Sequence, residues 1–324
     1  MNGWTVKEVG HYRDVLHWGP HPDPDCPPDG VVVEVAAAAI NFPDLLMIAG
    51  KYQVRPPRPF VPGLEAVGIV VKVGADSRFS LGDRLIVNGT HGAFAEKMAA
   101  TDRQSFPAPQ GMSDAEAAGF VVAYQTSHFA LTHRAGLSVG EVLLVHGGAG
   151  GVGTSAIQLG KYLGARVIAT ASTDEKLKHC KKVGADDVIN YTETDFASRV
   201  KELTGGHGAD VIFDPVGGDV TATSTKCIAW NGRLLIIGFA AGEIPSIPAN
   251  RILLKNISVV GLHWGNYFIH QPLLVNQAHQ QLTQWFDEQV IRPVIGGQFP
   301  LADLPAALEV VEQRRAIGKI ILGG

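Results

Sequence analysis

Apolar residues are spaced differently in successive parts of the chain. In the first third, short apolar runs at residues 31–35, 68–73 and 84–87 are separated by proline, glycine and aspartate, as strands are in a loop-rich β structure. Prolines are dense between Pro20 and Pro28 and between Pro56 and Pro62, which disfavours long helices there. This part of the chain is predicted to form a small β barrel or sandwich.

The pattern changes after Gly111. Ser113 and Glu116 have the S-x-x-E spacing of a capping box, so a helix is expected to begin there. From Glu141 to Gly261 buried runs alternate with helical segments. We expect strands at 142–145, 166–171, 187–190, 209–213, 233–237 and 257–261, and helices at 151–163, 174–183, 195–203 and between 213 and 233. Such alternation is typical of a parallel sheet covered by helices on both faces, here a Rossmann doubly wound α/β domain.

Beyond residue 262 the periodicity weakens. Helices are expected at 273–286 and 301–315, and a strand at 319–322. This segment is too short for a third domain, so we expect it to complete the first one. A length of 324 residues agrees with about two domains.

Composition narrows the function classes. The net charge of −4 provides no strong basic field for nucleic acid or an anionic membrane. Three scattered cysteines give neither a disulfide framework nor a CxxC zinc motif, and they favour a reducing compartment. The N-terminus lacks the apolar stretch of a signal peptide. We therefore expect a cytoplasmic protein with a small-molecule substrate and no nucleic-acid or membrane partner.

A glycine-rich turn is the sharpest motif. Gly148, Gly150 and Gly153 form G-x-G-x-x-G between a predicted strand and a predicted helix, which is the context that dinucleotide binding requires. The glycines allow a tight turn, the approach of a pyrophosphate and close packing of helix on strand, and the helix N-terminus offers free N–H groups. The residues expected to bind the cofactor here are Gly148, Gly150, Gly151, Val152 and Gly153.

The end of the second predicted strand indicates which dinucleotide binds. NAD-specific sites usually carry Asp or Glu there, whereas this chain has hydroxyl groups, including Ser172, and no acid. Lys176 and Tyr191 could bind a 2′-phosphate, so NADPH is favoured over NADH. The alternatives are that Ser172 only caps a helix together with Glu175, that Lys176 is solvated, that Tyr191 packs, and that Asp174 binds a ribose.

The sequence resembles the zinc-free quinone oxidoreductases, zeta-crystallin included, of the medium-chain dehydrogenase/reductase superfamily. The resemblance rests on the glycine turn and on matching stretches at residues 39–44, 50–52, 59–68, 82–84, 182–191 and 318–320. It implies a GroES-like catalytic domain from residues 1–119 and 263–324, with a Rossmann NADP-binding domain at 120–262 inserted in it. It also implies a homodimer formed through sheet edges of the cofactor domain.

Departures from the zinc alcohol dehydrogenases bear on metal binding. Those relatives have cysteine where Asn41 stands and histidine where Leu64 stands, and their structural lobe of four cysteines is absent here. Catalytic zinc needs about three protein ligands, which asparagine and leucine do not supply. No metal is expected. Without that Lewis acid, reduction of quinones or electron-poor double bonds is favoured over alcohol oxidation.

The resemblance also assigns roles around the nicotinamide. Asn41 would bind an amide or ribose hydroxyl, Thr126 the carboxamide, and Tyr52 would stack or donate a hydrogen bond to the developing oxyanion. Tyr52 could instead only pack, and Asn41 could be a turn residue. His146 is interpreted as structural. The residues implied to shape the nicotinamide end are Val216, Phe239, Ala240, Ala241, Leu262, His263 and Trp264.

Two other functions stay open. A 2-enoyl thioester (acyl-CoA) reductase would share the fold and the hydride chemistry, and its substrate phosphates would need a basic rim, for which Arg55 and Arg58 are the candidates. A non-catalytic NADPH-binding structural or regulatory protein is the alternative of another class. Turnover of NADPH with small quinones distinguishes an enzyme from such a protein.

Overall fold

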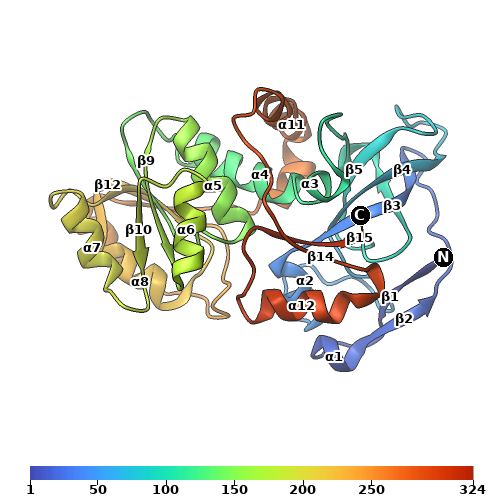
Figure 1. Ribbon diagram of the computed structural model, residues 1–324, viewed down its shortest axis with the longest axis horizontal. Coiled ribbons are helices and arrows are strands. Elements are labelled where there is room, and N and C mark those ends of the chain that lie inside the picture. The colour runs from blue at the N-terminus through green and yellow to red at the C-terminus, as the bar shows by residue number, and fades with distance from the viewer. Residues whose placement is uncertain (324) are drawn as a thin grey trace. The chain divides into compact units, whose positions relative to one another are not determined.

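The computed structural model describes residues 1–323, which form two compact units (Figure 1). Unit 1 comprises Met1–Val122, His270–Asp287 and the residues from Arg292 onward; unit 2 comprises Ala123–Ile269 and Glu288–Ile291. The sequence placed the changes of domain near residues 119 and 262. In the structure the chain leaves unit 1 inside helix α4 (Val121–His128) and returns after Ile269.

Unit 1 is built on a mostly antiparallel sheet of seven strands in the order β14-β15-β3-β4-β5-β7, with β6 also paired to β3. Its strands are β3 (Gly30–Ile40), β4 (Glu65–Val73), β5 (Arg84–Asn88), β6 (Lys97–Thr101), β7 (Ser105–Pro107), β14 (Ile295–Phe299) and β15 (Lys319–Gly323), beside a separate pair β1 (Asn2–Val6) and β2 (Leu16–Pro20). Its helices are α1 (Tyr12–Val15), α2 (Phe42–Ile48), η1 (Asp102–Gln104), α3 (Asp114–Ala118), α11 (Pro272–Asp287), η4 (Leu301–Asp303) and α12 (Leu304–Glu312). The pairing of β15 with β3 joins the end of the chain to its first third.

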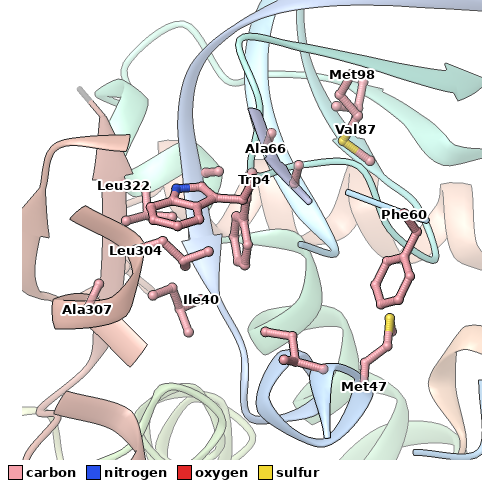
Figure 2. Close-up of a cluster of buried hydrophobic side chains, with 14 of the residues drawn as sticks. Trp4, Ile40, Met47, Phe60, Ala66, Val87, Met98, Leu304, Ala307 and Leu322 are labelled. Atoms are coloured by element: carbon pink, nitrogen blue, oxygen red, sulfur yellow. The ribbon is translucent and has the colours of Figure 1, made fainter. Parts of the chain in front are cut away.

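One hydrophobic cluster fixes the centre of unit 1 (Figure 2). Trp4 packs there with Ile40 and Leu304, and its indole Nε1 donates a hydrogen bond to the Leu301 carbonyl over 2.8 Å. Met47 brings α2 onto the same cluster. Because Ile40 ends β3 and Met47 lies in α2, packing on both sides fixes Asn41 between them.

Unit 2 is a parallel sheet of six strands in the order β10-β9-β8-β11-β12-β13. Its strands are β8 (Val142–Val145), β9 (Arg166–Ala171), β10 (Asp187–Asn190), β11 (Ala209–Asp214), β12 (Ile228–Ile236) and β13 (Ser258–Gly261). Its helices are α4, the π-helical turn η2 (Phe129–Arg134), α5 (Gly151–Tyr162), α6 (Asp174–Lys182), α7 (Phe196–Leu203), α8 (Gly218–Cys227), α9 (Ala249–Lys255), η3 (Trp264–Asn266) and α10 (Tyr267–His270). Right-handed crossovers of this order place helices on both faces of the sheet. The predicted fold class is confirmed.

Some elements differ from those expected. Strand β12 begins at Ile228, five residues before the predicted start. The sequence Asn231-Gly232 is typical of a turn, but here Asn231 takes a φ of 63° within the strand. The helix expected at 301–315 divides into η4 and α12, since Pro305 favours the first turn of a new helix. The sequence also missed α2, which begins at Phe42-Pro43.

Membrane insertion would require a long apolar helix. None of the helices in residues 1–323 combines the length and apolar character that a transmembrane span requires.

Candidate cofactor and active site

The glycine turn joins β8 to α5, as predicted. Gly150 is the N-cap of α5, and Gly148 N donates to the Thr170 carbonyl over 3.0 Å, which ties the turn to β9. The left-handed backbone needed for the turn lies at Gly147, with a φ of 60°, one residue before the G-x-G-x-x-G motif. The turn therefore uses one more glycine than the motif counts.

The three motif glycines meet different constraints. A Cβ on Gly153 would lie 2.2 Å from the Gly147 carbonyl oxygen, and one on Gly148 would lie 2.9 Å from the Ala169 Cβ, so both are required by packing. A Cβ on Gly150 would meet nothing closer than 3.5 Å, and its φ of −75° suits any residue. The chain itself does not require glycine at 150. A glycine there leaves room beside the helix N-terminus, where a pyrophosphate fits.

His146 lies under this turn and is fully engaged. Its Nδ1 is 3.1 Å from Thr170 Oγ1 and its Nε2 is 2.8 Å from Ser224 Oγ. Burial lowers the pKa of His146, against the opposing charge of Asp214. A buried neutral ring with two hydroxyl partners joins β9 and α8 to the turn, which agrees with a structural role.

The structure at the end of β9 contradicts one of the alternatives for Ser172. The N-cap of α6 is Thr173, whose Oγ1 accepts from Lys176 N over 3.4 Å, so the interpretation of Ser172 and Glu175 as a capping box is wrong. The helix begins one residue later than that alternative requires. The Ser172 side chain is therefore not engaged in capping α6.

Tyr191 follows β10, and its N–H donates to the Ala171 carbonyl over 3.2 Å, which places it beside the end of β9. Lys176 lies in the first turn of α6 and is partly buried, while Asp174 at the start of that helix is exposed. Ser172 and Tyr191 thus follow the ends of two neighbouring strands, and Lys176 lies in the first turn of the helix after β9. Two hydroxyls and an ammonium suit a phosphate group better than a neutral ribose.

The remaining candidates of unit 2 follow the other strands. Val216 comes after β11, and its carbonyl accepts from Ala241 N over 2.8 Å. Asp214, fully buried, accepts from Val216 N over 2.8 Å and from Thr221 Oγ1, and so fixes this loop. Phe239 and Ala240 follow β12, and Leu262, His263 and Trp264 follow β13. Ligands of open parallel sheets bind at the carboxyl ends of the strands, which is where all of these residues lie.

Thr126 lies on α4 and is partly exposed. Its neighbour Gln125 is buried, and Gln125 Oε1 accepts from Trp264 Nε1 over 3.2 Å. That bond ties α4 to the segment after β13. Thr126 therefore belongs to the same unit as the glycine turn, whereas Asn41 and Tyr52 belong to unit 1.

Asn41 is the N-cap of α2, so the interpretation of it as a turn residue is replaced by a capping role. Its backbone N–H donates to Asp44 Oδ2 over 2.7 Å. Its side-chain Nδ2 donates to Glu65 Oε1 over 3.0 Å, and its Oδ1 accepts from Lys319 Nζ over 2.7 Å. The sequence reasoning missed Glu65 and Lys319 as site residues, although both lie in stretches that carried the family resemblance.

Tyr52 packs against the cluster of Figure 2 and is only partly buried. Burial, followed by the nearby charge of Asp44, raises the pKa of Tyr52. Asp44 is fully buried, which raises its own pKa to about 7 although the Asn41 N–H and the Lys319 charge oppose this. Tyr52 consequently keeps its proton at neutral pH and can act as a hydrogen-bond donor.

A protein metal site needs several ligating side chains close together. Residues 1–323 contain no group of three or more His, Cys, Asp or Glu side chains arranged to hold a metal ion.

Two family models match the chain. Residues 27–110 match the alcohol dehydrogenase GroES-like domain, and residues 151–286 match the model described as zinc-binding dehydrogenase. The first range lies in unit 1; the second covers most of unit 2 and extends into α11 of unit 1.

Similar proteins cover nearly the whole chain. A quinone oxidoreductase-like protein 2 homolog from Nematostella vectensis is 40% identical over 90% of this chain and 81% of its own length. Quinone oxidoreductase from Escherichia coli, solved in complex with NADPH, has a TM-score of 0.94 and 29% identity, with both chains covered at 100%. Quinone oxidoreductase from Thermus thermophilus, also solved with NADPH, has a TM-score of 0.86 and 33% identity over 100% of both chains. The protein is thus an oxidoreductase that belongs to the quinone oxidoreductase family of the medium-chain dehydrogenases/reductases.

Proposed function

We propose that the protein reduces quinones or other α,β-unsaturated carbonyl compounds by hydride transfer from NADPH, without a metal. The observation that carries this proposal is the free space at Gly150, next to the N-terminus of α5. The relatives solved with NADPH support the choice of cofactor.

The residues of unit 2 would hold the cofactor. Backbone N–H groups of Gly151 and Val152 would bind the pyrophosphate, since the first N–H groups of a helix have no partner within it, whereas the Gly150 N–H already donates to the Gly147 carbonyl over 3.0 Å. Lys176, Ser172 and Tyr191 would bind the 2′-phosphate, and Thr126 the carboxamide. NADPH supplies a hydride when it is bound; the protein contributes binding, orientation and exclusion of water.

In unit 1, Tyr52 would serve the carbonyl oxygen of the acceptor. Negative charge develops on that oxygen as the hydride arrives, and a donor placed there stabilises the transition state. The raised pKa of Tyr52 keeps its hydroxyl protonated for this task. Asn41 would contact the nicotinamide half of the cofactor.

The proposal is tested by steady-state oxidation of NADPH and NADH with a panel of small quinones, simple enones and a 2-enoyl-CoA. We expect turnover of NADPH with quinones or enones and a much lower rate with NADH. Tight NADPH binding without turnover of any acceptor would contradict an enzymatic function and favour a binding protein.

The 2-enoyl thioester alternative has one observation in its favour. Arg55 and Arg58 are exposed, and Arg55 Nε donates to the Tyr52 carbonyl over 3.5 Å, so a cationic group lies beside a candidate site residue. A coenzyme A ester that is reduced faster than the matching simple enone would support it, provided that Arg55→Ala removes the difference.

We also propose a homodimer that forms through β13, an edge strand of the six-stranded sheet. An edge strand presents unpaired backbone groups that a second chain can bind. Exposed apolar side chains gather on β12, α9 and β13: Trp230, Leu253, Leu254 and Val259. Isolated exposed apolar residues are common, but four on successive elements favour an interface.

A cytoplasmic location is proposed on the state of the cysteines. Cys26, Cys180 and Cys227 are all free, as in proteins of a reducing compartment. Burial raises the pKa of Cys180 and of Cys227 to about 12, so neither thiol is reactive at neutral pH.

A further inference from the structure

A buried ion pair lies directly behind Asn41 in unit 1. Lys319 Nζ is 2.9 Å from Glu65 Oε1, and the two side chains are 7% and 0% exposed. Burying two charges is costly, and apolar residues of similar volume often serve stability as well as such a pair does. Stability alone therefore does not explain the presence of the pair at this place.

The pair fixes the orientation of the Asn41 amide. An ammonium only donates hydrogen bonds and a carboxylate only accepts them. Lys319 faces Oδ1 at 2.7 Å, and Glu65 Oε1 faces Nδ2 at 3.0 Å. Rotating the amide by 180° would set donor against donor and acceptor against acceptor, so one orientation is selected.

The same contacts determine what Asn41 can still offer a ligand. The second N–H of Nδ2 is directed to the Ala39 carbonyl over 3.4 Å, so both donors of Asn41 are engaged. Lys319 donates to the Ile40 carbonyl over 3.1 Å as well as to Asn41 and Glu65, so its three donors are engaged too. The one Asn41 side-chain atom left for a ligand is therefore the acceptor Oδ1, which binds Lys319 and also faces the Asp44 N–H of the capping box.

Glu65 is itself held from its other side. Its Oε2 accepts from the Val122 N–H over 2.9 Å at the start of α4, while its Oε1 binds Lys319 and Asn41. A carboxylate at a helix N-terminus is favoured by the helix dipole. The carboxylate therefore has little freedom to turn, and the position of Asn41 Nδ2 follows from it.

We propose that Glu65 and Lys319 are positioning residues that make Asn41 an acceptor-only contact for the nicotinamide half of NADPH. This inference rests on the proposed function. It adds that the cofactor group that contacts Asn41 must carry an O–H or N–H. Asn41 is thereby excluded as a donor to the oxygen of the substrate, and this task is left to Tyr52.

Binding measurements with three variants test the proposal. Glu65→Gln/Lys319→Met removes both charges together, because either single change would leave a buried unpaired charge. The other two variants are Asn41→Ala and the triple variant that combines all three changes. Each variant is titrated with NADPH, followed by cofactor fluorescence, and with 2′,5′-ADP, which lacks the nicotinamide half. Circular dichroism checks that each variant is folded.

If the ion pair acts through Asn41, the double variant and Asn41→Ala each weaken NADPH binding about tenfold, the strength of one hydrogen bond. The triple variant then binds no more weakly than Asn41→Ala, and 2′,5′-ADP affinity is unchanged throughout. The control is Glu116→Gln/Arg292→Met, which removes another ion pair of unit 1 and should leave NADPH binding unchanged.

Two results overturn the proposal. One is unchanged NADPH affinity in the folded double variant. The other is a triple variant whose fold loss of NADPH affinity equals the product of the losses in the double variant and in Asn41→Ala, because independent effects multiply. A wild-type protein that binds 2′,5′-ADP but not NADPH would instead refute the proposed function on which the inference rests.

The donor that Asn41 meets is identified with the 3-acetylpyridine analogue of NADPH, whose acetyl group has no N–H. If the carboxamide is the donor, Asn41→Ala leaves the affinity for the analogue unchanged. If a ribose hydroxyl is the donor, the loss is the same for both cofactors. A stronger loss against the analogue than against NADPH fits neither donor and would contradict an acceptor role.

Discussion

Thr173 Oγ1 accepts a hydrogen bond from the Lys176 backbone N–H over 3.4 Å, which makes Thr173 the N-cap of α6. The cap sets where α6 begins, and so where the Lys176 side chain leaves the first turn. Ser172 remains outside the helix as the last hydroxyl before the cap. Both features favour a phosphate-binding role for this corner of unit 2.

Replacing Lys176 with alanine should reduce the preference for NADPH over NADH. We expect about a tenfold loss of NADPH affinity, roughly 1.4 kcal/mol, with little change for NADH, because only NADPH carries the 2′-phosphate. Fluorescence titration with both cofactors measures it. Lys178→Ala, an exposed lysine on the same helix, is the control. Equal losses for the two cofactors would show that Lys176 does not contact the 2′-phosphate.

Gly150 and Gly153 should respond differently to alanine. Gly150→Ala fits the unliganded chain, so we expect an unchanged melting temperature and at least tenfold weaker NADPH binding. Gly153→Ala places a Cβ 2.2 Å from the Gly147 carbonyl oxygen, so both folding stability and binding should fall. Thermal unfolding and fluorescence titration separate the two cases. Full NADPH affinity in Gly150→Ala would argue against a pyrophosphate at this turn.

Asp44 makes unit 1 less stable as the pH rises. Because burial raises its pKa from 3.8 to about 7, the folded state holds the proton more tightly than the unfolded chain does. The stability from this group is fully present below pH 4 and is lost as the pH rises through 7, by about 4 kcal/mol at most. Asp44→Asn mimics the neutral acid and keeps an acceptor for the Asn41 N–H.

Melting temperatures between pH 5 and 8 test this effect. Asp44→Asn should become progressively more stable relative to the wild type over that interval. Asp25→Asn, an exposed aspartate, should follow the wild type. Parallel curves for wild type and Asp44→Asn would contradict the raised pKa.

His279 has the opposite effect on the pH dependence of stability: it makes unit 1 less stable as the pH falls. Its Nε2 donates to the Pro107 carbonyl over 3.0 Å and its ring lies 4.7 Å from that of Phe106, between centroids. Burial lowers its pKa from 6.5 to about 4. The stability from this depressed pKa is present above pH 6.5 and is lost as the pH falls through 4, by about 3 kcal/mol.

His279→Gln should therefore unfold with a flatter dependence on pH between 6.5 and 4 than the wild type. Chemical denaturation at several pH values measures the slope. His270→Gln, at an exposed position, provides the reference. A variant with the same acid sensitivity as the wild type would mean that His279 does not govern it.

Dimer formation should depend on α9. Leu253 and Leu254 are 75% and 77% exposed, so charged residues there cost a monomer little but would be buried in the proposed interface. We expect the wild type to be a dimer and Leu253→Glu/Leu254→Glu a monomer by light scattering after gel filtration. Val139→Glu, at an equally exposed apolar position of unit 2, should stay dimeric. A monomeric wild-type protein would contradict the proposed homodimer.

Much of unit 2 could be predicted because its information is local. The runs at β8, β9 and β10 and the glycine turn each show their period or their turn chemistry within a few residues. Thr173 was missed as the cap because Ser172 has equivalent chemistry one residue earlier, and only the backbone distinguishes them. In unit 1, the partners of Asn41 lie far away in the sequence: Lys319 is 278 residues from it. No spacing rule predicts such a contact.

The pairing of β15 with β3 has a consequence for how the protein is made. Residues 123–269 of unit 2 are translated in one stretch, so their sheet can form while synthesis continues. Glu65 is translated 254 residues before Lys319, and until then its carboxylate has no ammonium partner. The surroundings of Asn41 therefore take their final form only after all six strands of the unit 2 sheet have been translated.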